Sequence, residues 1–259
     1  MSEPDKKKAV HRAKEILENL YIHSAEHIKV EYIAAIRGAY VQEKPLRGAE
    51  GRLATIGAKG IITVNDEIEI PGKKRFVVAH ELGHFELHRG EAFSINCTDD
   101  NFRQWYRGSH IEIEANYFAA ELLMPENIYG RKIVGKDVSR QLIEDLAKEF
   151  STTITATSIR FVTLRQDYAL ICAENNEIKW FIVDFDQFPY PLNTKGKLHS
   201  NSMAYEFFNG GELSDKLFAV EHDAWFNWKV RGVIKELAIS LGRKYNQTLS
   251  FLYVEEEWD

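Results

Sequence analysis

The stretch His80-Glu81-Leu82-Gly83-His84 decides how this chain of 259 residues is interpreted. On an α-helix, residues four apart lie on one face a single turn from each other, so His80 and His84 can both direct a ring nitrogen at one metal ion. Glu81 then lies beside the metal rather than on it. In this arrangement a zinc ion acidifies and orients a bound water while a neighbouring carboxylate takes its proton. The stretch therefore predicts a hydrolytic zinc site.

The residues around this stretch favour a helix. Pro71 and Gly72 predict a turn, residues 75–87 contain no proline, and Gly90 can end the helix. The apolar positions of the segment are Phe76, Val77, Val78, Ala79, Leu82, Phe85 and Leu87. Gly83 lowers helix stability, so we expect a metal or a partner backbone to pass close to it. The alternative is a buried amphipathic helix whose histidines only make hydrogen bonds.

A catalytic zinc usually has three protein ligands, so two histidines are too few. His88 continues the stripe, but His80 and His88 are about 12 Å apart along the helix axis, too far to share one metal. The extended pattern with a third histidine six residues after the second also fails, because position 90 is Gly90. A glutamate from a second helix is the next option.

That second helix is predicted at residues 110–124. Its apolar stripe is Ile111, Ala115, Phe118, Ala119, Leu122 and Leu123. At about 100° per residue, Glu112 falls roughly 60° from the centre of the stripe, whereas Glu114 and Glu121 fall roughly 100° and 120° away on the other side. A carboxylate directed toward the core needs a partner, and a metal provides one, so Glu112 is the third candidate ligand. The alternative is a surface glutamate on an ordinary helix.

Asn116 lies one helical turn after Glu112 and on the same side. Its side chain can hydrogen-bond the remaining ring nitrogen of a ligand histidine and fix the tautomer. Two histidines and one carboxylate favour zinc over manganese.

Residues 76–88 and 112–125 together resemble the ImmA/IrrE family of zinc metallopeptidases, and the resemblance covers roughly residues 8–165. Within it, residues 51–65 resemble the family's hairpin before the active helix, and residues 137–165 resemble its trailing helix pair. The resemblance implies a gluzincin-like site.

In that site His80, His84 and Glu112 bind Zn²⁺ and Glu81 is the general base. It also implies cleavage of a cytoplasmic helix-turn-helix repressor, which switches on stress, phage-defence or mobile-element genes.

The predicted fold class is α+β, with a small zincin-like metallopeptidase domain whose helices pack on a short sheet. The remaining elements expected in this domain are helices at residues 6–20 and 28–37, strands at 39–43, 51–56 and 60–65, and a turn at 58–60. Strands at the edge of the cleft could hold an extended substrate segment by β-augmentation.

The segment 91–109 joins the two ligand helices and is a candidate lid or specificity element. If Cys97 moves onto the zinc, its thiolate occupies the position that water needs and inhibits the enzyme. The alternative is a half-buried, unreactive cysteine. The reaction also needs an oxyanion donor besides zinc, for which His88, Tyr106 and His110 are equal candidates, although His88 fits local packing or hydrogen bonding better.

Residues 137–165 predict two helices with a Ser/Thr cap between them, which resemble a helix-turn-helix. The second helix offers few basic or amide side chains at its start, where base contacts arise, so packing is favoured over DNA recognition. We therefore assign residues 1–165 to the metallopeptidase domain, with 126–165 as its helical, helix-turn-helix-like extension.

Residues 166–259 are predicted to form a second, small α/β domain, for which a sensory role and a stabilising or dimerising role are both open. The expected elements are strands at 168–173, 178–185 and 247–254, a turn at 174–177, a loop at 188–192 and a helix at 230–243. Trp225, Trp228 and Tyr253 could line a ligand pocket or fill a core, and a core is the commoner fate of aromatic residues.

Composition agrees with a soluble globule, since 44% of residues are hydrophobic and 28% are charged. The net charge of −6 does not indicate a basic nucleic-acid binder. Cys97 and Cys172 are the only cysteines, so no disulfide framework is expected. Residues 1–10 lack the apolar core of a signal peptide and no segment approaches 18 apolar residues, so we expect a cytoplasmic protein without a membrane span.

Two functions from different classes therefore follow from the sequence. The first is a zinc endopeptidase that cleaves a helix-turn-helix repressor. The second is a non-proteolytic zinc-containing sensor or binding module that sequesters a transcription factor. Glu81 discriminates between them, because a structural site has no use for that carboxylate and normally fills all four ligand positions with protein.

Overall fold

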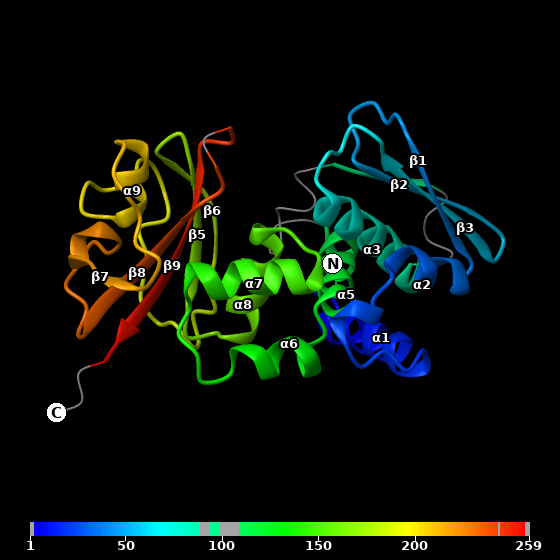
Figure 1. The fold of residues 1–259 in the computed structure, drawn as a ribbon, viewed down its shortest axis with the longest axis horizontal. Coiled ribbons are helices and arrows are strands. Elements are labelled where there is room, and N and C mark those ends of the chain that lie inside the picture. Colours follow the sequence, from blue (N-terminus) through cyan, green and yellow to red (C-terminus); the bar gives the residue numbers. More distant parts are fainter. Residues whose placement is uncertain (1–2, 89–93, 99–108, 243, 257–259) are drawn as a thin grey trace. The chain divides into compact units, whose positions relative to one another are not determined.

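The computed structural model describes residues 3–88, 94–98, 109–242 and 244–256. The chain divides into two compact units, the first formed by Met1–Lys132 and Lys148–Thr153, the second by Ile133–Ala147 and Ile154–Asp259. Figure 1 labels their helices and strands. Helices and two separate sheets make up the described structure, which confirms the α+β class.

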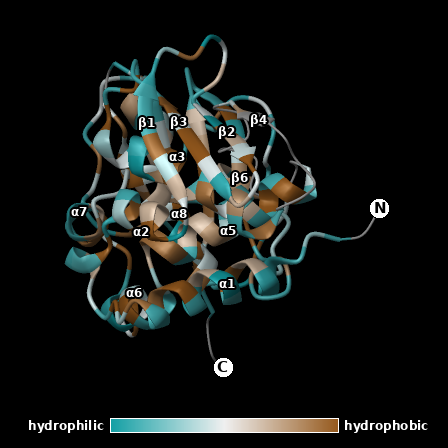
Figure 2. Cartoon of the chain, turned by 90° about the vertical axis from the view of Figure 1, so that its right-hand side faces the viewer, coloured by the Kyte–Doolittle hydropathy of each residue, from teal (hydrophilic) through white to brown (hydrophobic). Residues whose placement is uncertain are grey.

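The sheet of unit 1 has four strands in the order β1-β3-β2-β4. The strands are β1 (Ala39–Lys44), β2 (Gly51–Ile56), β3 (Lys59–Asn65) and β4 (Ser94–Cys97). β1 runs parallel to β3, whereas β2 is antiparallel to both β3 and β4. Gly57, with φ of 61°, and Ala58 form the turn between β2 and β3, one residue earlier than the sequence predicts. Figure 2 shows the four strands side by side.

The helices of unit 1 include the two that were predicted to carry the metal ligands. The helical elements are α1 (Lys6–Asn19), the 3₁₀ helix η1 (Ala25–His27), α2 (Val30–Ile36), α3 (Pro71–Leu87), α5 (His110–Leu123) and α6 (Glu126–Ile133). Pro71 begins α3 rather than forming a turn before it, because the first helical position needs no backbone N–H donor.

In unit 2 a helical pair precedes a five-stranded antiparallel sheet in the order β6-β5-β9-β8-β7. Its elements are most of α7 (Arg140–Phe150), then α8 (Ile154–Leu164), β5 (Ala169–Glu174), β6 (Glu177–Ile182), α9 (Met203–Phe208), β7 (Phe218–Ala219), the 3₁₀ helix η2 (His222–Ala224), β8 (Val233–Ser240) and β9 (Gln247–Glu255).

The helix predicted at residues 230–243 is wrong. The segment contains β8, which pairs with β9 from Val233 opposite Glu255 to Ser240 opposite Thr248. Its short apolar runs fit either a helix or a strand, and the long-range pairing with β9 decides in favour of the strand.

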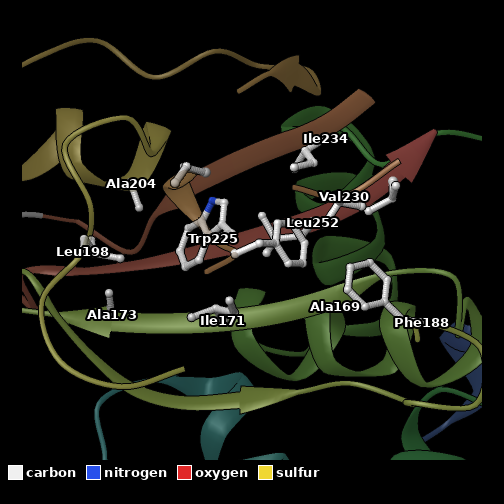
Figure 3. Packing of buried hydrophobic residues seen from close by; sticks show 14 residues of the cluster. Ala169, Ile171, Ala173, Phe188, Leu198, Ala204, Trp225, Val230, Ile234 and Leu252 are labelled. Carbon is white, nitrogen blue, oxygen red and sulfur yellow. The ribbon is translucent and has the colours of Figure 1, made fainter. Parts of the chain in front are cut away.

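A hydrophobic cluster fills one face of this sheet. Trp225 lies at its centre with Ile171, Leu252 and Phe188 around it, and is only 1% exposed (Figure 3). Trp225 is therefore a core residue, whereas Trp228 is 58% exposed. Tyr253 stacks on Tyr168, with ring centroids 5.1 Å apart.

By contact, residues 154–165 belong to unit 2, although the sequence analysis assigns them to the first domain. The predicted domain boundary at residue 165 stays a prediction. Across the described ranges, no helix combines the length and the apolar character that crossing a bilayer requires.

Candidate metal centre

Helix α3 places His80 and His84 side by side, as their four-residue spacing predicts. Both side chains are buried, and their Nε2 atoms are 3.0 Å apart. The helix can lie this close to α5 because of Gly83: a Cβ there would stand 3.2 Å from Cα and O of Ala115 and 3.1 Å from the Phe118 ring. The backbone of a partner helix therefore explains the glycine, as the sequence suggested.

Helix α5 brings Glu112 to the two histidines. Its Oε2 lies 3.1 Å from Nε2 of His80, and its Oε1 lies 3.5 Å from Nε2 of His84. Burial raises the pKa of the Glu112 carboxyl, but its hydrogen bonds with both histidines outweigh this and hold the pKa below its usual range. Glu112 is thus an ionised, buried carboxylate, the form that binds a metal.

The helical wheel underestimates the burial of one neighbouring glutamate. Glu121 is only 1% exposed, compared with 5% for Glu112. Its Oε1 accepts a hydrogen bond of 3.1 Å from the backbone N–H of Glu126, at the start of α6. The wheel could not show this, because the hydrogen-bond partner of Glu121 is the backbone at the start of the next helix.

Asn116 lies beside His80, as predicted. Its Oδ1 is 2.9 Å from Nδ1 of His80. An amide oxygen only accepts hydrogen bonds, so Nδ1 of His80 carries a proton. Nε2 is the ring nitrogen directed toward the cluster with Glu112 and His84, and it would be the atom that binds a metal.

A second orienting chain, which sequence analysis missed, runs through His88. Its Nε2 donates to Oε2 of Glu114 at 3.0 Å, so in the neutral ring Nδ1 is an acceptor. Nδ1 of His84 lies 3.1 Å from that Nδ1 and donates to it when His88 is neutral, so that Nε2 of His84 would be the metal-binding atom. Glu114 is in turn held by the backbone N–H of Asp5, at 2.7 Å. The four-residue spacing from His84 to His88 is the signal that could have revealed this chain.

Both ring nitrogens of His88 therefore take part in this chain, consistent with the local hydrogen bonding that its sequence position favours. His110 is the first residue of α5, and residues two apart on a helix do not face the same side, so it does not share the face of Glu112. Tyr106, the third candidate oxyanion donor, lies outside the described residues, as does most of the predicted lid. The oxyanion donor stays a prediction.

Strand β4 adds a fourth side chain, that of Cys97. Its thiol is fully buried and its Sγ lies 3.6 Å from Nε2 of His84. Potential ligand atoms of His80, His84, Cys97 and Glu112 all lie within 4.8 Å of one another. Burial and the negative charges of Glu81 and Glu112 raise the pKa of the Cys97 thiol, an effect that a bound cation would reverse.

Glu81 faces the same cluster without a partner of its own. It is fully buried, and among the described residues neither carboxylate oxygen has a hydrogen-bond partner. Burial raises the pKa of Glu81 to about 8; the nearby Cys97 thiol opposes this and the charge of Glu112 adds to it. On the sheet side Gly51 leaves the room that Glu81 needs, because a Cβ at Gly51 would overlap Oε1 of Glu81 and stand 2.7 Å from Cγ1 of Val77.

The geometry fits a zinc ion. Nitrogen, oxygen and sulfur ligands at zinc distances in a tetrahedral site stand roughly 3.3–3.6 Å apart. The separations of His84 from Glu112 and Cys97, 3.5 and 3.6 Å, lie in this range, and those that involve His80, 3.0–3.1 Å, are slightly shorter. Two imidazoles, a carboxylate and a thiol are also ligands that zinc prefers.

Two comparisons with known proteins found matches. Residues 34–161 match the model of the Peptidase M78 family, described as the IrrE N-terminal-like domain. Among solved structures, the chain is similar to a Mycobacterium tuberculosis transcriptional regulator, with 15% sequence identity and a TM-score of 0.55 over 95% of this chain and 76% of that chain. At this identity the similarity shows the fold alone. No curated protein matches the chain.

Proposed function

Because residues 34–161 match the IrrE N-terminal-like domain of the Peptidase M78 family, we propose that the chain is a zinc-dependent endopeptidase that cleaves a helix-turn-helix transcriptional repressor. Cleavage would switch on the stress, phage-defence or mobile-element genes that the repressor controls. We place the reaction in the cytoplasm, where such repressors act and where thiols such as Cys97 and Cys172 stay reduced.

The observation that carries this proposal is the buried carboxylate of Glu81, which lies beside the candidate ligands and has no hydrogen-bond partner within residues 3–88, 94–98, 109–242 and 244–256. Burying a carboxylate without hydrogen bonds costs several kcal/mol in principle, and proteins retain such groups chiefly at functional sites. A site that only stabilises the fold gains nothing from it. A base that removes a proton from a metal-bound water, however, has to stand beside the ligands and be free to accept that proton.

In the proposed mechanism His80, His84 and Glu112 hold the zinc ion. When bound, zinc supplies an acidified water and polarises the scissile carbonyl. Glu81 accepts the proton of the water on a carboxylate oxygen and passes it to the leaving amine. Asn116 and the His88–Glu114 pair would orient both ligand histidines so that Nε2 of each ring binds the metal. Buried side chains around the cluster limit the access of bulk water.

The test uses the helix-turn-helix protein that is encoded beside this chain as the candidate substrate. We expect wild type with zinc to cut it, and Glu81→Gln to reduce the rate by about 10²–10⁴-fold, the usual contribution of a general base. Glu144→Gln, on an exposed residue of α7, is the matched control and should cleave like wild type. Cleavage that survives Glu81→Gln would contradict the proposal.

The second candidate function is a zinc-containing module that binds and sequesters a transcription factor without cutting it. The observation that favours it is Cys97, since four protein ligands are typical of a structural zinc site. This function predicts that wild type and Glu81→Gln hold the transcription factor with equal affinity and leave it intact. If wild type produces cleavage fragments and Glu81→Gln does not, the peptidase function is supported and the sequestering function is wrong.

A further inference from the structure

Backbone pairing, rather than the metal ligands, sets the position of Cys97. Cys97 lies opposite Gly51 in the antiparallel register of β4 and β2. Its carbonyl oxygen accepts a hydrogen bond of 2.8 Å from the backbone N–H of Glu50. These contacts hold the residue at the end of β4 with its thiol toward His84. Cys97 therefore lies next to the other ligands as a consequence of the sheet.

The chemistry of the cluster suits a fourth ligand at this point. The distance between Sγ of Cys97 and Nε2 of His84 is 3.6 Å, close to the separation of roughly 3.6 Å expected for sulfur and nitrogen on one tetrahedral zinc. Zinc binds thiolates strongly, and the thiol proton is released to solvent when the bond forms. A thiolate here would occupy the position that the reactive water needs. Glu81, buried and without a hydrogen-bond partner among the described residues, faces the same position.

Strand β4 also covers the edge of the sheet that lies at the site. β2 is antiparallel to its neighbours, and β4 is its partner on the side away from β3 (Figure 2). Gly51 of β2 adjoins both Glu81 and, across the strand pair, Cys97. A substrate that adds to β2 as an extended strand would place one residue opposite Gly51, where Cys97 now lies. β4 and such a substrate cannot both pair with β2.

We propose that β4 is an autoinhibitory strand, which supplies Cys97 as the fourth protein ligand of the zinc site and fills the edge of β2 that an extended substrate would use. This inference rests on the proposed peptidase function. In the resting form the metal has four protein ligands and no water. Separation of β4 from β2 frees the fourth position for water and the edge for the substrate in one step.

Cobalt tests the ligand directly, because a thiolate bound to Co²⁺ gives an intense near-ultraviolet charge-transfer band. We expect the full chain loaded with Co²⁺ to show this band, Cys97→Ala and Cys97→Ser to lack it, and Cys172→Ala to keep it. Cys172 is the matched control because it is the other buried cysteine and lies on β5 of unit 2. A wild-type spectrum without the band would overturn the proposal. Two Cys97 variants are used so that, if one of them fails to fold, the spectrum of the other still tests whether Cys97 binds the metal.

Cleavage by the zinc-loaded chains tests the inhibition. We expect Cys97→Ala to cut the repressor at least about tenfold faster than wild type, as follows if the closed form is favoured by about 1.4 kcal/mol or more. An equal rate in both chains would refute autoinhibition. If wild type shows the band but neither wild type nor Cys97→Ala cleaves, the ligand assignment stands and the peptidase function fails. If wild type cleaves but lacks the band, the function stands and the inference fails.

Discussion

Glu81 in unit 1 and Glu236 in unit 2 are both completely buried, but in the part of the chain that the structure describes only Glu236 has hydrogen-bond partners. Glu236 accepts hydrogen bonds from the backbone N–H groups of Met203 and Ala204, from Nε1 of Trp225 and from the hydroxyl of Ser250, at 2.8–3.0 Å. Glu81 accepts none from the described residues.

The difference shows how to tell a structural buried charge from a functional one. Glu236 joins β8 to α9, to β9 and to the central tryptophan of the core, so its burial is compensated by contacts that hold the unit together. Among the described residues, the carboxylate oxygens of Glu81 receive no comparable set of donors. A buried carboxylate of this kind is suited to accept a proton.

Removal of the metal should have the largest effect on stability and should act on unit 1 alone. At a free zinc concentration about 1,000 times the dissociation constant, bound zinc stabilises the folded state by about 4 kcal/mol. We expect chelation to reduce the protection of α3 and α5 against hydrogen exchange, and zinc to restore it. Protection of β8 and β9 should not change. If chelation reduced the protection of β8 and β9 as much as that of α3 and α5, the prediction would be wrong.

Replacing each of the two buried glutamates by leucine should have the second largest effect, and the loss of stability should differ between them. Glu236→Leu leaves four donors without an acceptor, so we expect the free energy of unfolding to fall by at least about 3 kcal/mol. Glu81→Leu in the metal-free chain removes no hydrogen bond, and the same measurement, made by denaturant titration, should show no loss beyond about 1 kcal/mol. A large loss at Glu81 would mean that its carboxylate has a structural role.

Asn116→Ala should have a smaller effect that is confined to the metal. Loss of the acceptor for Nδ1–H of His80 releases the ring orientation, and the affinity for zinc should fall about 10–100-fold. Competition with a coloured chelator measures this affinity. Asn246→Ala, on an exposed asparagine of unit 2, serves as the control and should bind zinc like wild type. An unchanged affinity for zinc in Asn116→Ala would show that Asn116 does not orient His80 for metal binding.

The pH dependence of unit 2 should show the smallest effect. Burial raises the pKa of Glu236 above its ordinary value of 4.5, although its hydrogen bonds oppose this. The folded chain then holds the proton more tightly than the unfolded chain, so the contribution of Glu236 to stability falls as pH rises from 4.5 to the raised pKa.

Glu236→Gln removes this contribution. The difference in unfolding free energy between wild type and the variant should therefore change by no more than about 1.4 kcal/mol per pH unit. A difference that grows in favour of wild type as pH rises would show that the pKa of Glu236 is lowered instead.

Short-range patterns identified most of the metal centre. The spacing of His80 and His84 fixes their common face on any α-helix, and the same geometry brings Glu112 and Asn116 inward from α5. The structure places all four side chains together. The pattern could not show the Glu114–His88–His84 chain, because it depends on how α3 and α5 cross and on the backbone of Asp5.

Long-range pairing accounts for the remaining differences. The segment that forms β8 has an ambiguous local pattern, and its conformation follows from its pairing with β9. The sequence placed Cys97 in a loop that could move onto the metal, whereas β4 holds it beside the other ligands. Neither result can be obtained from local periodicity, because both depend on partner strands far away along the chain.

The sequence by itself determined that His80 and His84 share one helix face, that Glu112 and Asn116 face inward from a second helix, and that the class is α+β, because these depend on helical periodicity and residue chemistry. The tertiary structure decided that Cys97 joins the ligand cluster, that Glu81 is buried without a hydrogen-bond partner among the described residues, and that Glu236 is buried with four. Burial and hydrogen bonding between distant segments exist only after the chain has folded. The opening stretch therefore predicted where a metal would bind, and only the folded sheet showed that Cys97 lies beside that place.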